Sequence, residues 1–219
     1  VERHYVPGGY CQSFRRRGFT FNAGVEAISG FGPRGPLANL FRELGIDWRP
    51  LFVRVRDRYC FSGRCIDVGE LEDLRGSLTS LYPEEAGAVE SFLSEVVNVY
   101  REVYEVSKHF GVPLHPRLIY EVLGPEALLR YPAEHPNHYR WSKLSFQEVL
   151  DERFRNPELK KVLSALTGYL GTEPSRTPAD SMAVIYGYYI DGGYHPLGGS
   201  GALPKLLARV VEEGGGRVL

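Results

Sequence analysis

The strongest pattern in the chain is helical. From position 83 to about position 109, apolar residues recur every three or four positions, which is the spacing of one face of an amphipathic helix. The sequence therefore predicts a long helix that begins at Pro83 and is ended by Gly111, with an apolar stripe that other parts of the chain must cover. The stripe consists of Val89, Phe92, Leu93, Val96, Tyr100, Val103 and Tyr104.

Start signals mark several shorter helices. Pro36 suits the first position of a helix that Gly45 ends, and Ser145 with Glu148 has the spacing of a capping box. The run Thr177-Pro178-Ala179-Asp180 combines a cap, a proline and an acid, and it predicts a helix that continues to about position 190. That helix is apolar nearly all round, so it is expected to be buried or to line a cavity.

The remaining stretches between helices are predicted with weaker signals. Residues 158–170 read as one more helix, whereas 116–140 is predicted to be loop-rich with a short helix at 125–130. His135 and His138 lie in this region at a spacing that places them on one face only in a helix, which Pro136 opposes. Surface histidines are therefore favoured over metal ligands, and no metal site is predicted.

Alternating stretches predict short antiparallel strands. Residues 14–17 and 19–22 form one hairpin that turns at Gly18, and residues 51–58 form a second hairpin with 65–68. In the second hairpin one face is expected to be buried and the other solvated. The buried face is predicted to carry Leu51, Val53 and Val55.

A glycine pair near the start of the chain is a candidate binding feature. Gly8 and Gly9 have no Cβ, so a bulky ligand can approach the backbone closely there. Glu2 precedes the pair by six residues and reads as the end of a strand, where a carboxylate can accept a hydrogen bond from a ribose hydroxyl. Taken alone, a glycine pair is more typical of a tight turn.

A second glycine-rich segment, Gly198–Gly201, lies directly before a helix near the end of the chain. Free backbone N–H groups at a helix start can bind an electron-rich ligand atom. A structural tight turn is the competing interpretation.

One motif match is rejected. Gly30–Gly35 fits the pattern G-x-G-x-x-G and precedes a helix, but the dinucleotide fingerprint also needs a buried strand before it. Residues 26–29 make a poor strand, and Pro33 lacks one of the backbone N–H groups. A loop that leads into the Pro36 helix is predicted instead.

The first glycine segment resembles the FAD site of the phytoene desaturase and amine oxidase superfamily, which has a Glu, a Gly-Gly about six residues later and a GFTFDAG-like hairpin. This chain reads PGGYCQSFRRRGFTFNAG, which looks closest to the branch with retinol saturases and carotenoid isomerases. It departs from the family at Tyr10, where Arg is common, and at Asn22, where Asp is common. The segment YYIDGGYHPLGGSGALPKLLARVVEEGGGRV resembles the family's return to the FAD domain.

The resemblance implies an α/β (α+β) fold. Residues 1–30 and 196–219 are expected to form part of a Rossmann-type FAD/NAD(P)-binding domain. Residues 31–195 are expected to form an inserted substrate domain with a small antiparallel sheet and a helical lid. The first dinucleotide fingerprint of the family would precede residue 1, so the 219-residue chain alone is expected to be inactive and not to hold FAD.

The resemblance also implies a function: an FAD-dependent oxidoreductase, which would be a desaturase, a saturase or a redox-assisted isomerase of a polyene or isoprenoid. The expected partner is thus a hydrophobic small molecule, and no residue is assigned as catalytic. Substrate contact is assigned to Glu26, Tyr188 and Tyr189. Binding of FAD is assigned to Glu2, Gly8, Gly9, Tyr10, Cys11, Gly24 and Val25.

Two alternatives stay open. A flavin amine oxidase shares the scaffold but attacks a C–N bond. A non-catalytic lipid-binding helical module is a third hypothesis, and it agrees poorly with glycine segments at both ends of the chain.

Composition narrows the partners. The formal net charge is −1, so no overall charge favours nucleic acid or an anionic membrane. No apolar run of about 18 residues is present, so a cytoplasmic location is expected, with any membrane contact peripheral. Cys60 and Cys65 can face each other across a hairpin, but two free thiols are predicted because nothing indicates an oxidising compartment. The oligomeric state is not predicted.

Overall fold

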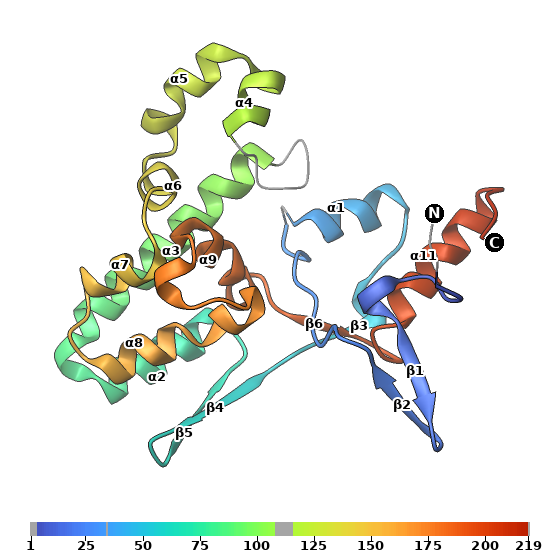
Figure 1. The fold of residues 1–219 in the computed structure, drawn as a ribbon, viewed down its shortest axis with the longest axis horizontal. Helices are drawn as coiled ribbons and strands as arrows, with labels where there is room; N and C mark the ends of the chain where they lie inside the picture. Colours follow the sequence, from blue (N-terminus) through green and yellow to red (C-terminus); the bar gives the residue numbers. More distant parts are fainter. Residues whose placement is uncertain (1–3, 34, 108–115, 219) are drawn as a thin grey trace.

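The computed structural model describes residues 4–33, 35–107 and 116–218. The predicted long helix is confirmed as α3 (Ala86–Ser107), which follows a short 3₁₀ turn at Pro83–Glu85. In Figure 1, α3 runs through a group of helices, whereas α1, α11 and the β1–β2 hairpin lie together on the other side of the molecule.

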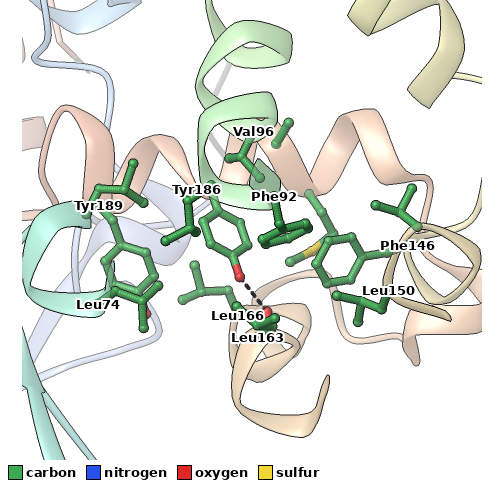
Figure 2. Packing of buried hydrophobic residues seen from close by; sticks show 14 of the residues in the cluster. Leu74, Phe92, Val96, Phe146, Leu150, Leu163, Leu166, Tyr186 and Tyr189 are labelled. Atoms are coloured by element: carbon green, nitrogen blue, oxygen red, sulfur yellow. Dashed lines mark hydrogen bonds between the residues drawn. The ribbon is translucent and has the colours of Figure 1, made fainter. Parts of the chain in front are cut away.

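The apolar stripe of α3 forms the centre of the larger hydrophobic core. Phe92, Leu93 and Val96 are fully buried there, among side chains from α2 (Leu71–Leu81) and from the helices after residue 140. Figure 2 shows this packing, in which Phe92 lies between Tyr186 and Phe146. Burying such side chains is the main favourable contribution to folding, at about 1.5–3 kcal/mol for each large apolar residue.

The predicted capping box is confirmed: the Ser145 hydroxyl accepts from the Glu148 N–H, and the Glu148 carboxylate accepts from the Ser145 N–H. Two other helix predictions are corrected. The predicted helix 158–170 is α-helical only to Leu163 and continues as a 3₁₀ helix. Thr177 does not cap a helix, because its hydroxyl donates to the Glu173 carbonyl. The helices of this region are α7 (Phe146–Asp151), α8 (Pro157–Leu163), α9 (Ala179–Ile185) and α10 (Gly187–Ile190).

The loop-rich prediction for 116–140 is wrong. The structure has three helices there: α4 (Pro116–Leu123), α5 (Pro125–Glu134) and α6 (Pro136–Trp141). Each begins with a proline, because the first helical position has no use for a backbone N–H and the fixed φ of proline suits it. The prolines that suggested breaks are therefore helix starts, although Pro132 lies inside α5.

Six short strands form three antiparallel pairs. The first predicted hairpin is confirmed as β1 (Ser13–Arg16) with β2 (Phe19–Asn22). The predicted strand 51–58 is divided: β3 (Phe52–Arg54) pairs with β6 (Tyr194–Pro196), and only β4 (Asp57–Phe61) pairs with β5 (Arg64–Val68).

Because β3 has this distant partner, its buried face is the opposite of the predicted one. Phe52 is buried and Val53 is 51% exposed. The free-thiol prediction is also wrong, because Cys60 and Cys65 lie opposite each other in the β4–β5 hairpin and form a disulfide.

A second, smaller core lies where α1 (Pro36–Glu43) and β3 meet α11 (Ala202–Glu213). Phe31, Phe41, Phe52 and Leu203 are its buried members. This core crosses the boundary predicted at residue 30, and it brings the C-terminal helix against residues 28–52. At the level of fold class, the mixture of helices with small antiparallel sheets agrees with the prediction.

The buried hydroxyl of Tyr186 gives a test of the larger core. This residue is 1% exposed, and its hydroxyl donates to the Leu163 carbonyl oxygen at 2.7 Å (Figure 2). Tyr186→Phe leaves that buried oxygen without its partner, so the free energy of unfolding is expected to fall by about 1–3 kcal/mol in urea titrations. Tyr120→Phe, at an exposed position, is the control and should change it by less than about 0.5 kcal/mol. Equal stabilities of the two variants would contradict the packing described.

The disulfide gives a second test. Alkylation followed by peptide mapping is expected to label Cys11 without reduction and to label Cys60 and Cys65 only after reduction. Labelling of all three without reduction, in protein isolated under non-reducing conditions, would restore the free-thiol prediction.

Candidate functional site

The two glycine segments lie in direct contact, although about 190 residues separate them. A Cβ added to Gly8 would stand 2.6 Å from Cγ of Pro204, so only glycine fits against the first turn of α11. Gly8 also has φ 118°, a backbone conformation that favours glycine. We call this region the glycine junction; it consists of residues 8–13, 22–24 and 198–204.

Side chains at the base of the β1–β2 hairpin hold the junction together. The Ser200 N–H donates to Asn22 Oδ1 at 2.9 Å, and the Gly201 N–H donates to Ser13 Oγ at 2.9 Å. The Ser13 hydroxyl in turn donates to Asn22 Oδ1 at 3.2 Å. Two facing residues of one strand pair, Ser13 and Asn22, thus bind the turn that precedes α11.

These bonds correct the prediction of free N–H groups at the C-terminal glycines. Besides Ser200 and Gly201, the Gly199 N–H donates to the Pro196 carbonyl and the Ala202 N–H to the Gly199 carbonyl. The competing interpretation, a structural tight turn, describes these residues. Gly198 is different, because a Cβ there would meet only Ala202, at 3.9 Å.

The outer side of the junction is open. Gly9 begins a short 3₁₀ turn (Gly9–Cys11), and no atom lies within 4 Å of the position its Cβ would take. The N–H groups of Gly9 and Tyr10 have no acceptor inside this turn because they are its first residues. Tyr10 is 86% exposed, and its ring lies 3.6 Å from the Cβ position of Gly24. Cys11 is a half-buried free thiol.

The chain after Gly24 leads from the junction toward the helical core. Val25 is half-buried and Glu26 is exposed. The His195 Nδ1–H donates to the Glu26 carbonyl at 2.7 Å, and Ile28 forms an antiparallel bridge with Tyr194. Residues 24–28 therefore lie beside β6. Glu2, the predicted ribose ligand, lies outside the described residues.

The predicted substrate residues Tyr188 and Tyr189 lie in α10 and are buried. The Tyr189 hydroxyl bonds to that of Tyr59, and the Tyr188 hydroxyl bonds to Asp57 and Tyr169. We call Tyr59, Tyr169, Tyr188 and Tyr189 the tyrosine cluster. Three of its neighbours were not found from the sequence, because β4 and the 3₁₀ helix that supply them carry no motif. These are Asp57, Tyr59 and Tyr169.

Electrostatics keep the cluster's hydroxyls protonated. Burial raises the pKa of Tyr188, and the charge of Asp57 raises it further. Burial also raises the pKa of Tyr189 and of Tyr169, and Glu26 adds to the shift at Tyr169 through its charge. The structure thus brings the predicted residues Glu26 and Tyr188 to the same neighbours, on opposite sides of Tyr169.

The rejected motif Gly30–Gly35 is a loop, as predicted. No strand feeds it beyond the single bridge at Ile28, and the Gly30 carbonyl accepts from the N–H groups of Leu37 and Ala38 at the start of α1. Gly32 is required for a packing reason, because its Cβ position is filled by the carboxylate of Asp191. These contacts leave no phosphate cradle there.

Comparison with known proteins decides the family. The model of the flavin containing amine oxidoreductase family matches residues 1–219. The chain belongs to this family. Membership confirms the resemblance seen in the glycine segments, and it confirms FAD as the predicted cofactor. The open side of the glycine junction fits a large group of this kind, since Gly9 and Gly198 leave space and the first N–H groups of the Gly9 turn are unused.

Curated relatives of known name are more distant. All-trans-retinol 13,14-reductase of Rattus norvegicus is 27% identical over 228 residues, which cover 100% of this chain and 36% of the relative. The 4,4'-diapophytoene desaturase (4,4'-diaponeurosporene-forming) of Staphylococcus haemolyticus is 25% identical and covers 90% of this chain and 39% of its own. Prolycopene isomerase 1, chloroplastic, of an Oncidium hybrid cultivar is 22% identical, with 100% and 37% covered. The chain thus spans little more than a third of their length.

Two searches of the described residues found nothing. None of the helices there is long and apolar enough to cross a membrane. Within the same residues, no three or more His, Cys, Asp or Glu side chains are grouped so that they could hold a metal ion; His138 instead bonds to Tyr131 and Asp180.

The junction explains the departure at Asn22 and gives a test. Asn22 Oδ1 acts there only as an acceptor, so the carboxylate of Asn22→Asp can take the same bonds, and stability is expected to stay within about 0.5 kcal/mol or rise. Asn22→Ala loses both bonds and should lower the free energy of unfolding by about 1–3 kcal/mol. Thr20→Ala, on the same strand, is the matched control. If Asn22→Asp is as damaging as Asn22→Ala, the acceptor role is wrong.

Proposed function

We propose that this chain is part of an FAD-dependent oxidoreductase that acts on a polyene or another hydrophobic isoprenoid, as a desaturase, a saturase or a redox-assisted isomerase. The observation that carries the proposal is the glycine junction, in which both family segments meet around an open backbone surface. The relatives are named for retinol, diaponeurosporene and prolycopene, which are all isoprenoid polyenes, and this supports the substrate class.

In this proposal the outer side of the junction binds the cofactor. Gly8 fixes the turn against α11, Gly9 lets the cofactor approach the backbone, and the N–H groups of Gly9 and Tyr10 donate to it. The exposed ring of Tyr10 and the thiol of Cys11 border the same surface, and Gly24 and Val25 continue it. Glu2 is proposed as the ribose ligand. Bound FAD would supply hydride or electron transfer.

Substrate contact is proposed for Glu26, Tyr188 and Tyr189. The course of residues 24–28 from the junction toward the tyrosine cluster supports this, because it connects the two places in a short distance along the chain. Tyr188 and Tyr189 would contribute neutral, largely apolar ring surfaces, since their raised pKa values keep them uncharged. Glu26 is the one of the three with an exposed side chain.

The domain division is also part of the proposal. Residues 1–30 and 196–219 belong to the FAD-binding domain, and 31–195 form the substrate domain, whose helices cover the substrate as a lid. The glycine junction supports the first assignment because it joins both ends of the chain. The long helical core around α3 supports the second.

Gly9 allows a direct test of the cofactor site in the full-length protein. Gly9→Phe fills the open space, and the bound FAD per protein, measured by absorbance after purification, is expected to fall at least tenfold. Gly45→Phe is the control, because Gly45 also has a positive φ (68° against 52°) and also faces open space, but it lies at the end of α1. Equal FAD content in both variants would remove Gly9 from the site.

The substrate class is tested by product analysis with the same full-length protein. Incubation with a conjugated polyene is expected to change the number or geometry of its double bonds, which absorbance spectra and chromatography detect. Oxidation of benzylamine with no change in the polyene would instead support an amine oxidase.

A further inference from the structure

A cavity of about 400 Å³ lies between α1 and the loop that follows it, away from the residues assigned above to FAD and substrate. Its volume is in the range of small-molecule sites, about 300–1,000 Å³. We call it the α1 pocket. Its lining consists of Phe31, Gly32, Pro33, Ala38, Arg42, Ile46, Asp47, Trp48 and Arg49.

The floor of the α1 pocket is aromatic and held in place from below. The rings of Phe31 and Trp48 lie 4.4 Å apart, and Trp48 also contacts the edge of Tyr194 at 5.1 Å. Phe31 is only 5% exposed and packs on Phe41 and Phe52, so the floor is part of the smaller core. Trp48 keeps part of its surface accessible, which leaves a flat apolar surface open to the cavity.

The rim of the α1 pocket carries excess positive charge. Asp47 is the one carboxylate in the lining, and it is already paired with Arg49 at 3.1 Å. Arg42 donates to Asn39 Oδ1 at 2.9 Å and has no carboxylate partner among the residues that the structure describes. The three charged groups of the lining therefore sum to about +1, and the Arg42 guanidinium retains donors for an anion.

A structural role for Arg42 accounts for only part of this arrangement. A cation in the last turn of α1 complements the helix dipole, which any position in that turn would do. The dipole does not require an accessible aromatic floor beside the cation. The backbone of the Gly30–Gly35 loop cannot anchor the ligand instead, since the Gly35 N–H donates to the Gly32 carbonyl and the Gly30 carbonyl is used by α1.

We propose that the α1 pocket binds a small molecule that combines a planar apolar body with one carboxylate. The planar body lies against Phe31 and Trp48, and the carboxylate accepts hydrogen bonds from Arg42. Guanidinium groups suit carboxylates because their planar N–H donors match the two oxygens. The site is separate from the glycine junction and does not depend on the function proposed above.

The test is calorimetric titration of the FAD-loaded, full-length protein with 2-naphthoate and with the neutral 2-naphthalenemethanol. Arg42→Met is expected to weaken 2-naphthoate binding about tenfold or more and to leave the neutral compound unchanged, because only the charge-assisted bonds are lost. Trp48→Leu is expected to weaken both. Arg209→Met, an exposed arginine on α11, is the control and should change neither.

Bound FAD and the thermal unfolding midpoint of each variant are measured alongside, so that loss of folding is recognised. Binding of 2-naphthoate that is equal in the wild type and in Arg42→Met would overturn the proposal, because the probe would then occupy another apolar site. Absence of saturable binding to the wild type at millimolar concentration would overturn it as well. Neither result depends on the polyene activity.

Discussion

The contact on which the rest of this structure depends is the set of hydrogen bonds between the base of the β1–β2 hairpin and the turn before α11. Asn22 and Ser13 bind the N–H groups of Ser200 and Gly201, across 178 and 188 residues of sequence. A single neutral hydrogen bond contributes only about 0.5–1.5 kcal/mol. Here three bonds share one site, and together they determine where the Gly8–Gly9 turn meets α11. An open surface for a cofactor exists only if this contact forms.

The two hydrophobic cores are joined by a similar economy of polar groups. Asp191 accepts a hydrogen bond from the Tyr100 hydroxyl of α3 at 2.6 Å, and its carboxylate fills the place beside Gly32 where a side chain would stand. The same segment then supplies β6, which pairs with β3. The helical core, the loop before α1 and the smaller core are thus connected through residues 191–196. A change at Asp191 is expected to affect both cores, unlike a change at Phe92.

Sequence patterns predicted the parts of the fold that local chemistry determines. The stripe of α3, the capping box at Ser145 and the turn at Gly18 each depend on residues a few positions apart. The errors arose where a distant partner decides. Residues 51–58 alternate like one strand, but β3 pairs with a segment about 140 residues away, which reversed its buried face. In 116–141 the prolines were read as breaks, although each starts a helix.

For the site, the sequence located the glycines but could not separate their roles, because a glycine needed for packing and one needed for a ligand look the same in a sequence. The structure separates them. Gly8 and Gly32 are explained by the fold, since Pro204 and the Asp191 carboxylate occupy the space a Cβ would need. Gly9 and Gly198 face open space at the junction, where no protein atom requires their small size. Open glycines elsewhere, such as Gly45, end helices or turn hairpins. Gly9 and Gly198 combine openness with a position where the two family segments meet, so a ligand is the remaining physical reason for the absence of a side chain.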